Sequence, residues 1–359
     1  MIKWQSAIVA SLLAVPLTAV PAVASAASAD GARDTVERRR FDLQAHRGGM
    51  GLVVENTLDA FANALRVGVS TLELDIQITE DGKAVVTHDR HQTGRACVDT
   101  GPAVPGDPEY PYVGKFVHTL SLAQIKTLDC GSKTQPDFPG QRPAPGARMP
   151  LLSEVFDLVK SFDADRVKLN VETKVEAGAP SQTAPREQFV QAVVKEVRRA
   201  RILDQVTIQS FDWGALMRMR QVEPRLPLVA LDNYHFLQIG QPGASPWLGG
   251  IDIDDFGGDP LKAIASFGAT SFSPVHGYPE DGTADDPDYQ PYVTRSMVER
   301  ARRLGIKVIP WSVNDLATMN KLMDDGVHGL ITDYPDRLRA LMASRGFALP
   351  RQYDGPALG

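Results

Sequence analysis

Strand-like and helix-like segments alternate along most of this chain, and this alternation limits its fold more than any other feature. The predicted strands are residues 41–46, 71–78, 83–88, 167–172, 206–209, 226–231, 250–254, 269–273, 307–311 and 329–332. The predicted helices are residues 57–67, 152–162, 186–201, 213–222, 260–267, 294–304, 316–325 and 335–344. A βα alternation repeated about eight times predicts an α/β fold, the (β/α)8 TIM barrel, with its chemistry at the carboxyl ends of the strands.

Residues 94–150 interrupt the alternation after the second strand region. The segment is rich in Pro, Gly and aromatic residues and contains one predicted short helix, residues 122–128. Long insertions of this kind are usually lids, specificity elements or decoration. Cys97 and Cys130 both lie in it. In an oxidising compartment they would form a disulfide worth about 3 to 4 kcal/mol, and the alternative is two separate buried thiols.

Residues 1–29 have the pattern of a secretory signal peptide: an early Lys3, an apolar centre and a run of small residues at the end. A membrane anchor is disfavoured because Pro16 and Pro21 interrupt the apolar segment. We therefore expect an exported protein, periplasmic or extracellular, without a stable membrane anchor. Residues 30–359 have the length and the ordinary apolar content of a single barrel domain.

The formal net charge of the chain is −6 at pH 7. This balance gives no general attraction to nucleic acid or to an anionic membrane surface, and we expect no nucleic-acid partner. An anionic small-molecule substrate would have to be held by local cations.

The predicted strand at residues 71–78 carries two acids on one face, because its polar and apolar residues alternate with a period of two. Glu73 and Asp75 are these acids, and the same alternation in residues 166–174 adds Glu172. If both faces of the sheet are covered, the carboxylates are buried and a cation must compensate their charge. Oxygen ligands of this kind suit Mg²⁺ or Ca²⁺ rather than Zn²⁺.

Ten short motifs occur in an order and spacing similar to those of a known family. They are Ala45-His46-Arg47-Gly48, Glu55-Asn56-Thr57, Glu73-Leu74-Asp75, Thr79-Glu80-Asp81-Gly82, His88-Asp89, Met149-Pro150-Leu151-Leu152-Ser153-Glu154, Asn170-Val171-Glu172-Thr173-Lys174, Gln209-Ser210-Phe211, Pro310-Trp311-Ser312-Val313-Asn314 and Gly329-Leu330-Ile331-Thr332-Asp333-Tyr334-Pro335. From Ala45 to the helix after Asp336 the chain resembles the glycerophosphodiester phosphodiesterases, of the bacterial, exported type.

This resemblance implies a βα barrel that hydrolyses glycerophosphodiesters to glycerol 3-phosphate and an alcohol, with one divalent cation, Ca²⁺ or Mg²⁺. The site residues that it implies are, for the metal, Glu73, Asp75 and Glu172; for acid/base chemistry, His46 and His88; and for phosphate binding, Arg47 and Lys174.

The types of residue present support this chemistry independently of the resemblance. Hydrolysis of a phosphodiester needs neutralised phosphate oxygens, an activated oxygen nucleophile and a proton for the departing alkoxide. Two imidazoles that titrate near neutrality can act as base and acid. Our hypothesis is that His46 is the base and His88 the acid, although the sequence does not fix this order. The substrate's own glycerol hydroxyl is an alternative nucleophile, which would give a cyclic phosphate that water then opens.

Each of these residues also has a structural interpretation. The two imidazoles could be satisfied interior histidines, and the acids could form a metal-free salt-bridge network with the two cations. Glu55 either caps the following helix or supports the site, and Asn56 is more typical of a cap than of a ligand. Trp311 is interpreted as a wall for the substrate's glycerol rather than barrel core, and Asp333 as a residue that fixes the final loop. The other histidines are expected at the surface or in loops: His91, His118, His235, His276 and His328.

Two rival functions follow from the same pattern. One is a related barrel phosphodiesterase that acts on membrane lipid, of the phospholipase C-like or sphingomyelinase D-like type. An exposed apolar loop would distinguish such an enzyme, and residues 110–112 and 278–292 are the candidates for this loop. The other is a non-catalytic module that binds glycerophosphodiesters, which is disfavoured because all seven implied reactive positions are present. The head-group preference, the native metal and the oligomeric state do not follow from the sequence.

Overall fold

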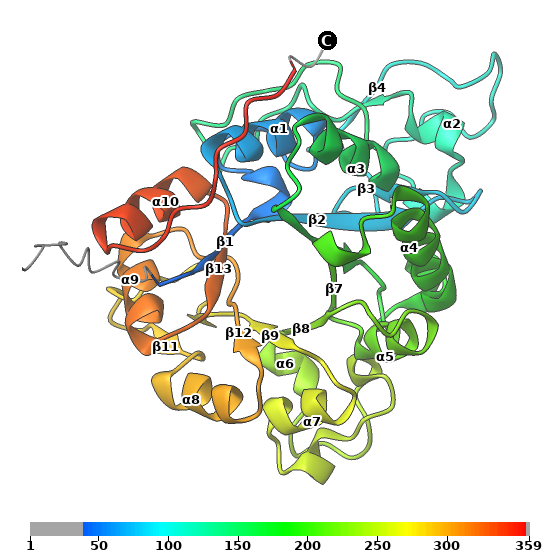
Figure 1. The fold of residues 1–359 in the computed structure, drawn as a ribbon. Coiled ribbons are helices and arrows are strands. Elements are labelled where there is room, and N and C mark those ends of the chain that lie inside the picture. Colours follow the sequence, from blue (N-terminus) through cyan, green and yellow to red (C-terminus); the bar gives the residue numbers. More distant parts are fainter. Residues whose placement is uncertain (1–38, 357–359) are drawn as a thin grey trace, which may run out of the picture. The chain divides into compact units, whose positions relative to one another are not determined.

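The computed structural model describes residues 39–356, and the predicted signal peptide lies outside them. Eight parallel strands curve into a nearly closed barrel (Figure 1), in the order β12, β9, β8, β7, β6, β2, β1, β13. Their bounds are β1 Asp42–Ala45, β2 Thr71–Ile78, β6 Lys168–Thr173, β7 Val206–Ser210, β8 Leu228–Asp232, β9 Ser271–Pro274, β12 Lys307–Val308 and β13 Gly329–Thr332. The N–H of His328 donates to the Val308 carbonyl at 2.9 Å and brings the start of β13 beside β12. The predicted (β/α)8 barrel is therefore confirmed.

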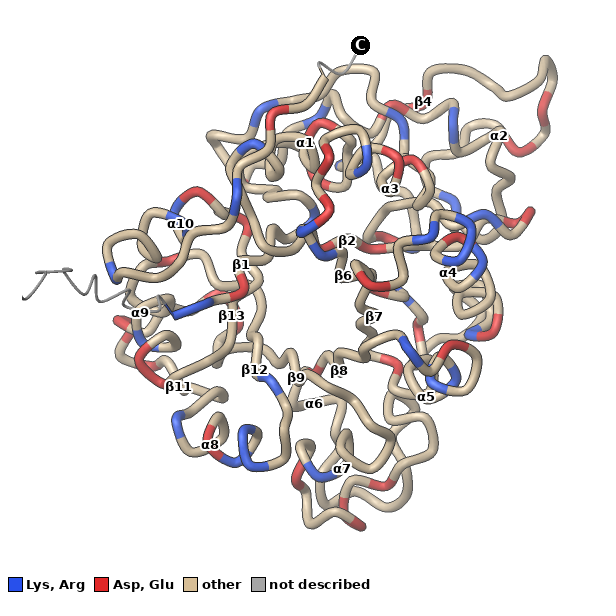
Figure 2. The backbone as a smooth tube through the Cα atoms, viewed as in Figure 1, with Lys and Arg blue, Asp and Glu red and all other residues tan. Residues whose placement is uncertain are grey.

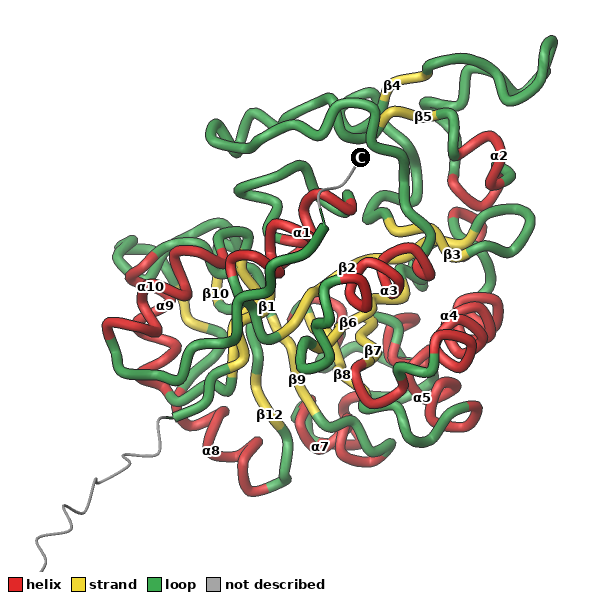
Figure 3. The backbone as a smooth tube through the Cα atoms, turned by 45° about the horizontal axis from the view of Figure 1, so that its top comes forward, coloured by secondary structure: helices red, strands yellow, loops and turns green. Residues whose placement is uncertain are grey.

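Helices surround the strands on the outside of the barrel (Figure 3). These helices are α1 Leu58–Val67, α3 Leu152–Ser161, α4 Arg186–Ala200, α5 Trp213–Val222, α6 Tyr234–Leu237, α7 Pro260–Ser266, α8 Arg295–Arg303, α9 Leu316–Asp325 and α10 Pro335–Ser344, while α2 Leu122–Ile125 lies in the insertion. In α4 the residues Phe189, Val193 and Val197 form one apolar stripe at helical spacing, and all three are buried. The hydroxyl of Thr57 caps α1 by accepting the N–H of Ala60.

The predicted strand at residues 250–254 is wrong. Ile253–Phe256 forms a short 3-10 helix instead, and β8 pairs directly with β9. The side chain of Asp252 accepts the N–H of Asp254, a local bond that favours a turn over an extended strand.

Residues 94–150 lie between the barrel's β3 (Ala84–Val86), which pairs with β2, and α3. They fold around a second, smaller apolar cluster, which includes Tyr112, Leu120 and Leu128 and also Val85 of β3. β4 (Val98–Asp99) and β5 (Leu128–Asp129) pair there, and the sulfurs of Cys97 and Cys130 are joined in a disulfide. The remaining small elements are β10 Gly277–Tyr278, β11 Gln290–Pro291 and the 3-10 helices η1 His46–Gly48, η2 Val117–Thr119, η3 Pro180–Gln182, η4 Leu203–Gln205, η5 Pro246–Leu248 and η6 Ile253–Phe256.

Acidic and basic residues are interspersed over the helices around the barrel (Figure 2). Among the described residues, no helix has both the length and the apolar character needed to cross a bilayer.

Candidate active site

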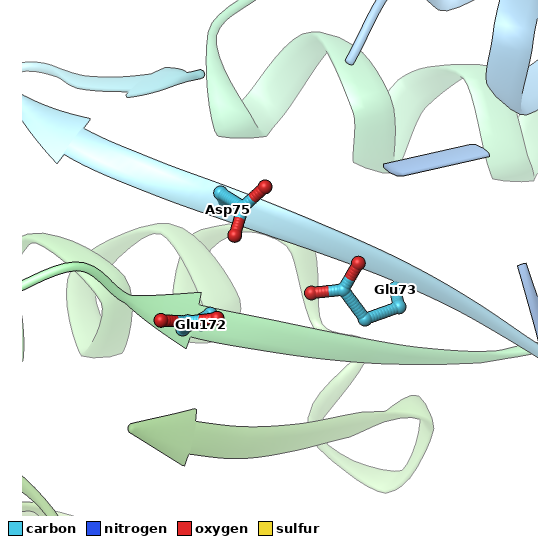
Figure 4. Close-up of side chains that lie close together, drawn as sticks. All are labelled: Glu73, Asp75 and Glu172. Carbon is cyan, nitrogen blue, oxygen red and sulfur yellow. The ribbon is translucent and has the colours of Figure 1, made fainter. Parts of the chain in front are cut away.

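Three acids from two neighbouring strands converge at the barrel's centre (Figure 4). β2 and β6 pair in parallel with Asp75 opposite Glu172, and Glu73 lies two residues before Asp75 on the same face. One oxygen from each carboxylate lies within 4.8 Å of the other two. Glu73 and Asp75 are each 1% exposed and Glu172 is 6% exposed. The alternation in the sequence thus becomes a buried cluster of three acids, which we call the acid cluster.

Burial makes it unfavourable for all three acids of the cluster to be ionised at the same time. Burial, reinforced by the neighbouring Asp75, raises the pKa of Glu73 to about 8. Burial likewise raises the pKa of Glu172 to about 7, although Lys174 opposes this. Burial acts in the same direction on Asp75, but the adjacent Arg47 outweighs it and holds the pKa of Asp75 below its usual value. Because close carboxylates repel, the cluster does not ionise fully by itself.

Two basic side chains contact the acid cluster. Lys174 Nζ lies 2.8 Å from Glu172 Oε1 and 4.0 Å from Asp75 Oδ1. Arg47 Nε lies 3.3 Å from Asp75 Oδ2, while its Nη1 donates to Glu55 at 2.7 Å. Glu55 and the acid cluster together carry four carboxylates against these two cations. One divalent cation would balance the two remaining charges.

A second feature of the acid cluster also favours a bound divalent cation. Among the described residues, Asp75 Oδ1 is a buried oxygen with no hydrogen-bond partner. Buried acceptors without a partner are rare and need a physical explanation. Three carboxylates are hard oxygen ligands of the kind that Ca²⁺ and Mg²⁺ prefer. Glu73, Asp75 and Glu172 would therefore hold the metal.

His46 follows β1 directly and is the first residue of η1. Its Nδ1 donates to Asp333 Oδ1 at 2.6 Å, and Asn314 Nδ2 donates to the other oxygen of Asp333 at 2.6 Å. Burial and the charge of Arg47 lower the pKa of His46, but the Asp333 carboxylate outweighs them and the net shift is upward. His46 also lines a cavity, and its Nε2 is the ring nitrogen that Asp333 does not engage.

His88 approaches the acid cluster from the segment after β3. Its Nδ1 donates to Asp89 Oδ1 at 2.8 Å. Burial lowers the pKa of His88 to about 4, and the charges of Arg47 and Lys174 act in the same direction. The two imidazoles therefore have the same type of carboxylate partner but opposite pKa shifts.

The segment between β1 and α1 supports the site through its backbone. Arg47 and Asn56 have φ angles of 51° and 55°, in the left-handed region that side chains rarely adopt. The N–H of Arg47 donates to Glu73 Oε2 at 2.9 Å, and Asn56 Nδ2 donates to Asp75 Oδ2 at 3.0 Å. Thr57 is the cap of α1, whereas Glu55 and Asn56 bond to Arg47 and Asp75.

Two cavities meet at this site. The inner cavity has a volume of about 190 Å³ and is lined by His46, Arg47, Glu73 and Gln209, among others. The outer cavity has a volume of about 610 Å³. The residues that line both are His88, Glu172, Lys174, Phe211 and Trp311. Trp311 thus lies in the cavity wall and not in the barrel core.

Several residues of the site were not predicted from the sequence. Gln209 had no predicted role, but its Nε2 donates to Glu73 Oε1 at 2.7 Å. Asp333 was predicted to fix the final loop, but its carboxylate accepts a hydrogen bond from His46 Nδ1. The signal for both was present, because each belongs to a motif that carried the family resemblance. His276, expected at the surface or in a loop, lies in the segment after β9 but is buried, with its nitrogens bonded to Tyr289 and to the Glu280 carbonyl.

Comparisons with known proteins agree with this geometry. The model of the family described as "Glycerophosphoryl diester phosphodiesterase family" matches residues 46–337. A glycerophosphodiester phosphodiesterase of Caldanaerobacter subterraneus subsp. tengcongensis is 28% identical over 302 residues, which cover 84% of this chain and 98% of the relative. The crystal structure of a candidate glycerophosphoryl diester phosphodiesterase of Silicibacter pomeroyi matches with a TM-score of 0.69 and 29% identity, over 86% of this chain and 95% of that chain.

A more distant structural match has the same fold. It is a phosphodiesterase of Oleispira antarctica, solved in complex with the product sn-glycerol-3-phosphate. The TM-score is 0.58 at 18% identity, and the match covers 84% of this chain and 96% of that chain.

Proposed function

The chain belongs to the glycerophosphoryl diester phosphodiesterase family, and from this premise we propose that it hydrolyses glycerophosphodiesters to glycerol 3-phosphate and an alcohol with one bound Ca²⁺ or Mg²⁺. The observation that carries the proposal is the acid cluster, with its oxygens within 4.8 Å of one another, next to two imidazoles and two basic side chains. No other group of three His, Cys, Asp or Glu residues among residues 39–356 has this geometry.

The phosphate of the substrate binds in the inner cavity, beside Arg47 and Lys174. Both side chains line this cavity and both keep their charge at neutral pH, since nearby carboxylates hold the pKa of each above its ordinary value despite burial. The metal held by the acid cluster would withdraw charge from the phosphate oxygens. Trp311 offers a flat apolar wall for the glycerol unit.

His46 acts as the base in this proposal. The carboxylate of Asp333 fixes the ring through Nδ1 and raises the pKa of His46, so the neutral ring is a strong base whose Nε2 accepts a proton from the attacking hydroxyl. That hydroxyl belongs either to water or to the glycerol of the substrate, in which case a cyclic phosphate forms first and water opens it.

His88 acts as the acid. It lines both cavities, so it lies where the phosphate meets the departing alcohol. Burial and the charges of Arg47 and Lys174 lower its pKa in the free site. An anionic phosphate bound between these cations offsets their effect and raises the pKa of His88, which favours the protonated ring when substrate is present.

We also propose that the protein is exported to the periplasm or the medium. Residues 1–29 have the pattern of a signal peptide, and the Cys97–Cys130 disulfide fits an oxidising compartment.

Release of glycerol 3-phosphate from glycerophosphodiesters tests the catalytic proposal. Protein stripped of metal with a chelator should be inactive, and Ca²⁺, Mg²⁺ or Mn²⁺ should restore activity. Full activity in the stripped protein, or none with any of the three ions, would contradict the proposal. Liposomes of intact phospholipid, assayed in parallel, distinguish a lipid-directed enzyme from one that acts on soluble diesters.

A further inference from the structure

The barrel interior next to the acid cluster contains three amide side chains. They are Gln44 of β1, Asn170 of β6 and Gln209 of β7, and all three are buried. The interior of a barrel of this type is usually filled by branched apolar side chains. A buried amide is costly unless its polar atoms are hydrogen-bonded, so the partners of these amides show what they do.

The three amides form one hydrogen-bonded chain, which we call the amide chain and which ends at the acid cluster. Asn170 Nδ2 donates to Gln44 Oε1 at 3.0 Å and to Gln209 Oε1 at 2.7 Å. Gln209 Nε2 donates in turn to Glu73 Oε1 at 2.7 Å. At the other end, Gln44 Nε2 donates to Asp42 Oδ2 at 2.9 Å. The amide chain therefore connects a carboxylate at the start of β1 with one of the three acids.

These bonds fix which way the amide of Gln209 is turned. Asn170 accepts the hydroxyl of Thr207 on its oxygen at 2.9 Å, and its amide nitrogen donates to Gln44 and to Gln209. Gln209 therefore presents its oxygen to Asn170 and its nitrogen to Glu73. The inverted amide would set a donor against a donor at Asn170 and an acceptor against an acceptor at Glu73.

Gln209 acts on the acid cluster through Glu73. Its amide nitrogen is a donor and does not bind a cation, and its oxygen is used by Asn170. The other oxygen of Glu73 accepts the N–H of Arg47 at 2.9 Å. One donor on each oxygen fixes the carboxylate of Glu73 on the side where Asp75 and Glu172 lie (Figure 4). Hydrogen bonds from neighbouring residues commonly orient metal ligands in this way.

On the basis of the proposed function, we propose that Gln209 is a positioning residue of the metal site and that Asn170 acts through it. Gln209 holds the carboxylate of Glu73 ready for the ion. Without this bond the ion itself would have to order the side chain of Glu73, and this loss of conformational entropy would weaken binding.

Calorimetric titration of the full chain with Ca²⁺ and with Mg²⁺ tests this role without substrate. Gln209→Met keeps the length of the side chain and removes the donor, so it should raise the Kd of both ions by about 10- to 100-fold. Ser210→Ala is the matched control, because it removes a buried hydrogen bond, to the Thr173 carbonyl at 2.9 Å, on the opposite face of the same strand. The control should keep the wild-type Kd. A wild-type Kd in Gln209→Met would overturn the proposal.

A second variant tests the role of Asn170. Asn170→Leu leaves Gln209 in place but removes the donor that orients it, so the Kd should rise by about tenfold. The double variant with Gln209→Met should bind the ions no more weakly than Gln209→Met alone, because Asn170 acts through Gln209. Losses that multiply in the double variant would indicate a general disturbance of the barrel and would overturn the positioning role.

Thermal unfolding in chelator shows whether each variant is folded. If Gln209→Met does not fold, the Kd of Asn170→Leu decides alone, and a wild-type value would overturn the proposal.

Release of glycerol 3-phosphate by the wild type separates this inference from the proposed function. If Gln209→Met binds the ions more weakly but the wild type hydrolyses no glycerophosphodiester, the proposed function fails and the positioning role stands. If the wild type is active and Gln209→Met binds the ions equally well, only the positioning role fails. If the wild type binds neither ion, the positioning role is overturned, and the release assay decides the hydrolysis separately.

Discussion

At the scale of single residues, the site is built from pairs in which one member fixes the other. Asp333 and Asp89 each accept from the Nδ1 of one imidazole, at 2.6 and 2.8 Å, and this leaves Nε2 of both His46 and His88 for the substrate. A carboxylate on Nδ1 sets both the tautomer and the direction of the ring. In the proposed mechanism, both rings therefore present Nε2 to the substrate.

Removal of either imidazole tests this arrangement. His46→Ala and His88→Ala should each lower kcat by about 10² to 10⁴, because each removes one proton transfer of the reaction. Asp333→Asn should lower kcat less than His46→Ala does, since the ring remains but loses its fixed tautomer. The assay is glycerol 3-phosphate release at saturating substrate. His235→Ala, an exposed histidine outside both cavities, is the control. Full activity in His88→Ala would remove it from the mechanism.

We predict that the acid cluster releases protons when a metal ion binds. The pKa of Glu73 is raised to about 8 and that of Glu172 to about 7, mainly by burial, so at pH 6.5 the metal-free cluster still holds protons that a cation must displace. Calorimetric titration with Ca²⁺ in buffers of different ionisation enthalpy should show proton release at pH 6.5 and little at pH 9. Proton release of equal size at both values would contradict these shifts.

The same ion should stabilise the fold. A ligand that binds the native state alone at 100 times its Kd adds about 2.7 kcal/mol to the free energy of unfolding. Thermal unfolding with Ca²⁺ should therefore give a higher Tm than with a chelator, and Glu73→Gln should lose most of this difference. A metal-dependent rise in Tm that persists in Glu73→Gln would place the ion elsewhere.

The buried carboxyl of Asp232, which is not part of the acid cluster, should make the stability of the fold depend on pH. Burial raises its pKa to about 7, although Tyr292 donates a hydrogen bond to it at 2.7 Å. The unfolded carboxyl loses its proton near pH 4 while the folded one keeps it up to about pH 7. Stability is therefore full below pH 4 with respect to this group and falls by at most about 4 kcal/mol as the pH rises to 7.

Asp232→Asn should remove this fall. The free energy of unfolding, measured with urea at several values between pH 4 and 8, should decline less steeply in the variant than in the wild type. The slope is the informative quantity, because the new amide also changes the hydrogen bonding at every pH. Asp285→Asn, an exposed acid in the segment before β11, should keep the wild-type slope.

At the scale of the elements, the register between strands brings distant residues together. The parallel pairing of β2 with β6 sets Asp75 opposite Glu172, and the pairing of β6 with β7 sets Glu172 opposite Gln209. A shift of one residue in either register would turn these side chains to the outer face, because side chains alternate along a strand.

The insertion at residues 94–150 is the element whose stability depends on the disulfide. Cys97 and Cys130 are 33 residues apart, and loss of a bridge closing a loop of this size costs about 2 to 4 kcal/mol. In Cys97→Ala/Cys130→Ala, amide hydrogen exchange should rise across the insertion and stay unchanged in the barrel strands. Uniformly faster exchange over both would mean that the insertion and the barrel unfold as one unit.

At the scale of the whole molecule, we predict that the protein is found without its signal peptide and with its two cysteines oxidised. Cell fractionation should recover it outside the cytoplasm and shortened by the signal peptide. Intact mass should rise by about two hydrogen masses on reduction, as one disulfide requires. Full-length protein in the cytoplasm with both thiols free would contradict the export proposal.

The barrel fold and the shared face of the acids follow from local patterns in the sequence. Periodicity of two along residues 71–78 determines that Glu73 and Asp75 share a face, and periodicity of 3.6 determines the apolar stripes of helices such as α4. At residues 250–254 the strand pattern gave a wrong prediction. There the side chain of Asp252 accepts a hydrogen bond from the backbone and caps a short 3-10 helix.

The contacts that these residues make with one another do not follow from such local patterns. The hydrogen bond between Asp333 and His46 joins residues 287 positions apart. Likewise, four aromatic rings from separate segments pack against one another, those of Trp311, Phe211, Phe236 and Trp247. Periodicity gives the face of an element on which a side chain lies, but its neighbours across that face depend on strand register and on closure of the barrel. These long-range contacts determine the partners of the imidazoles, the volumes of the two cavities and the pairing of their charges.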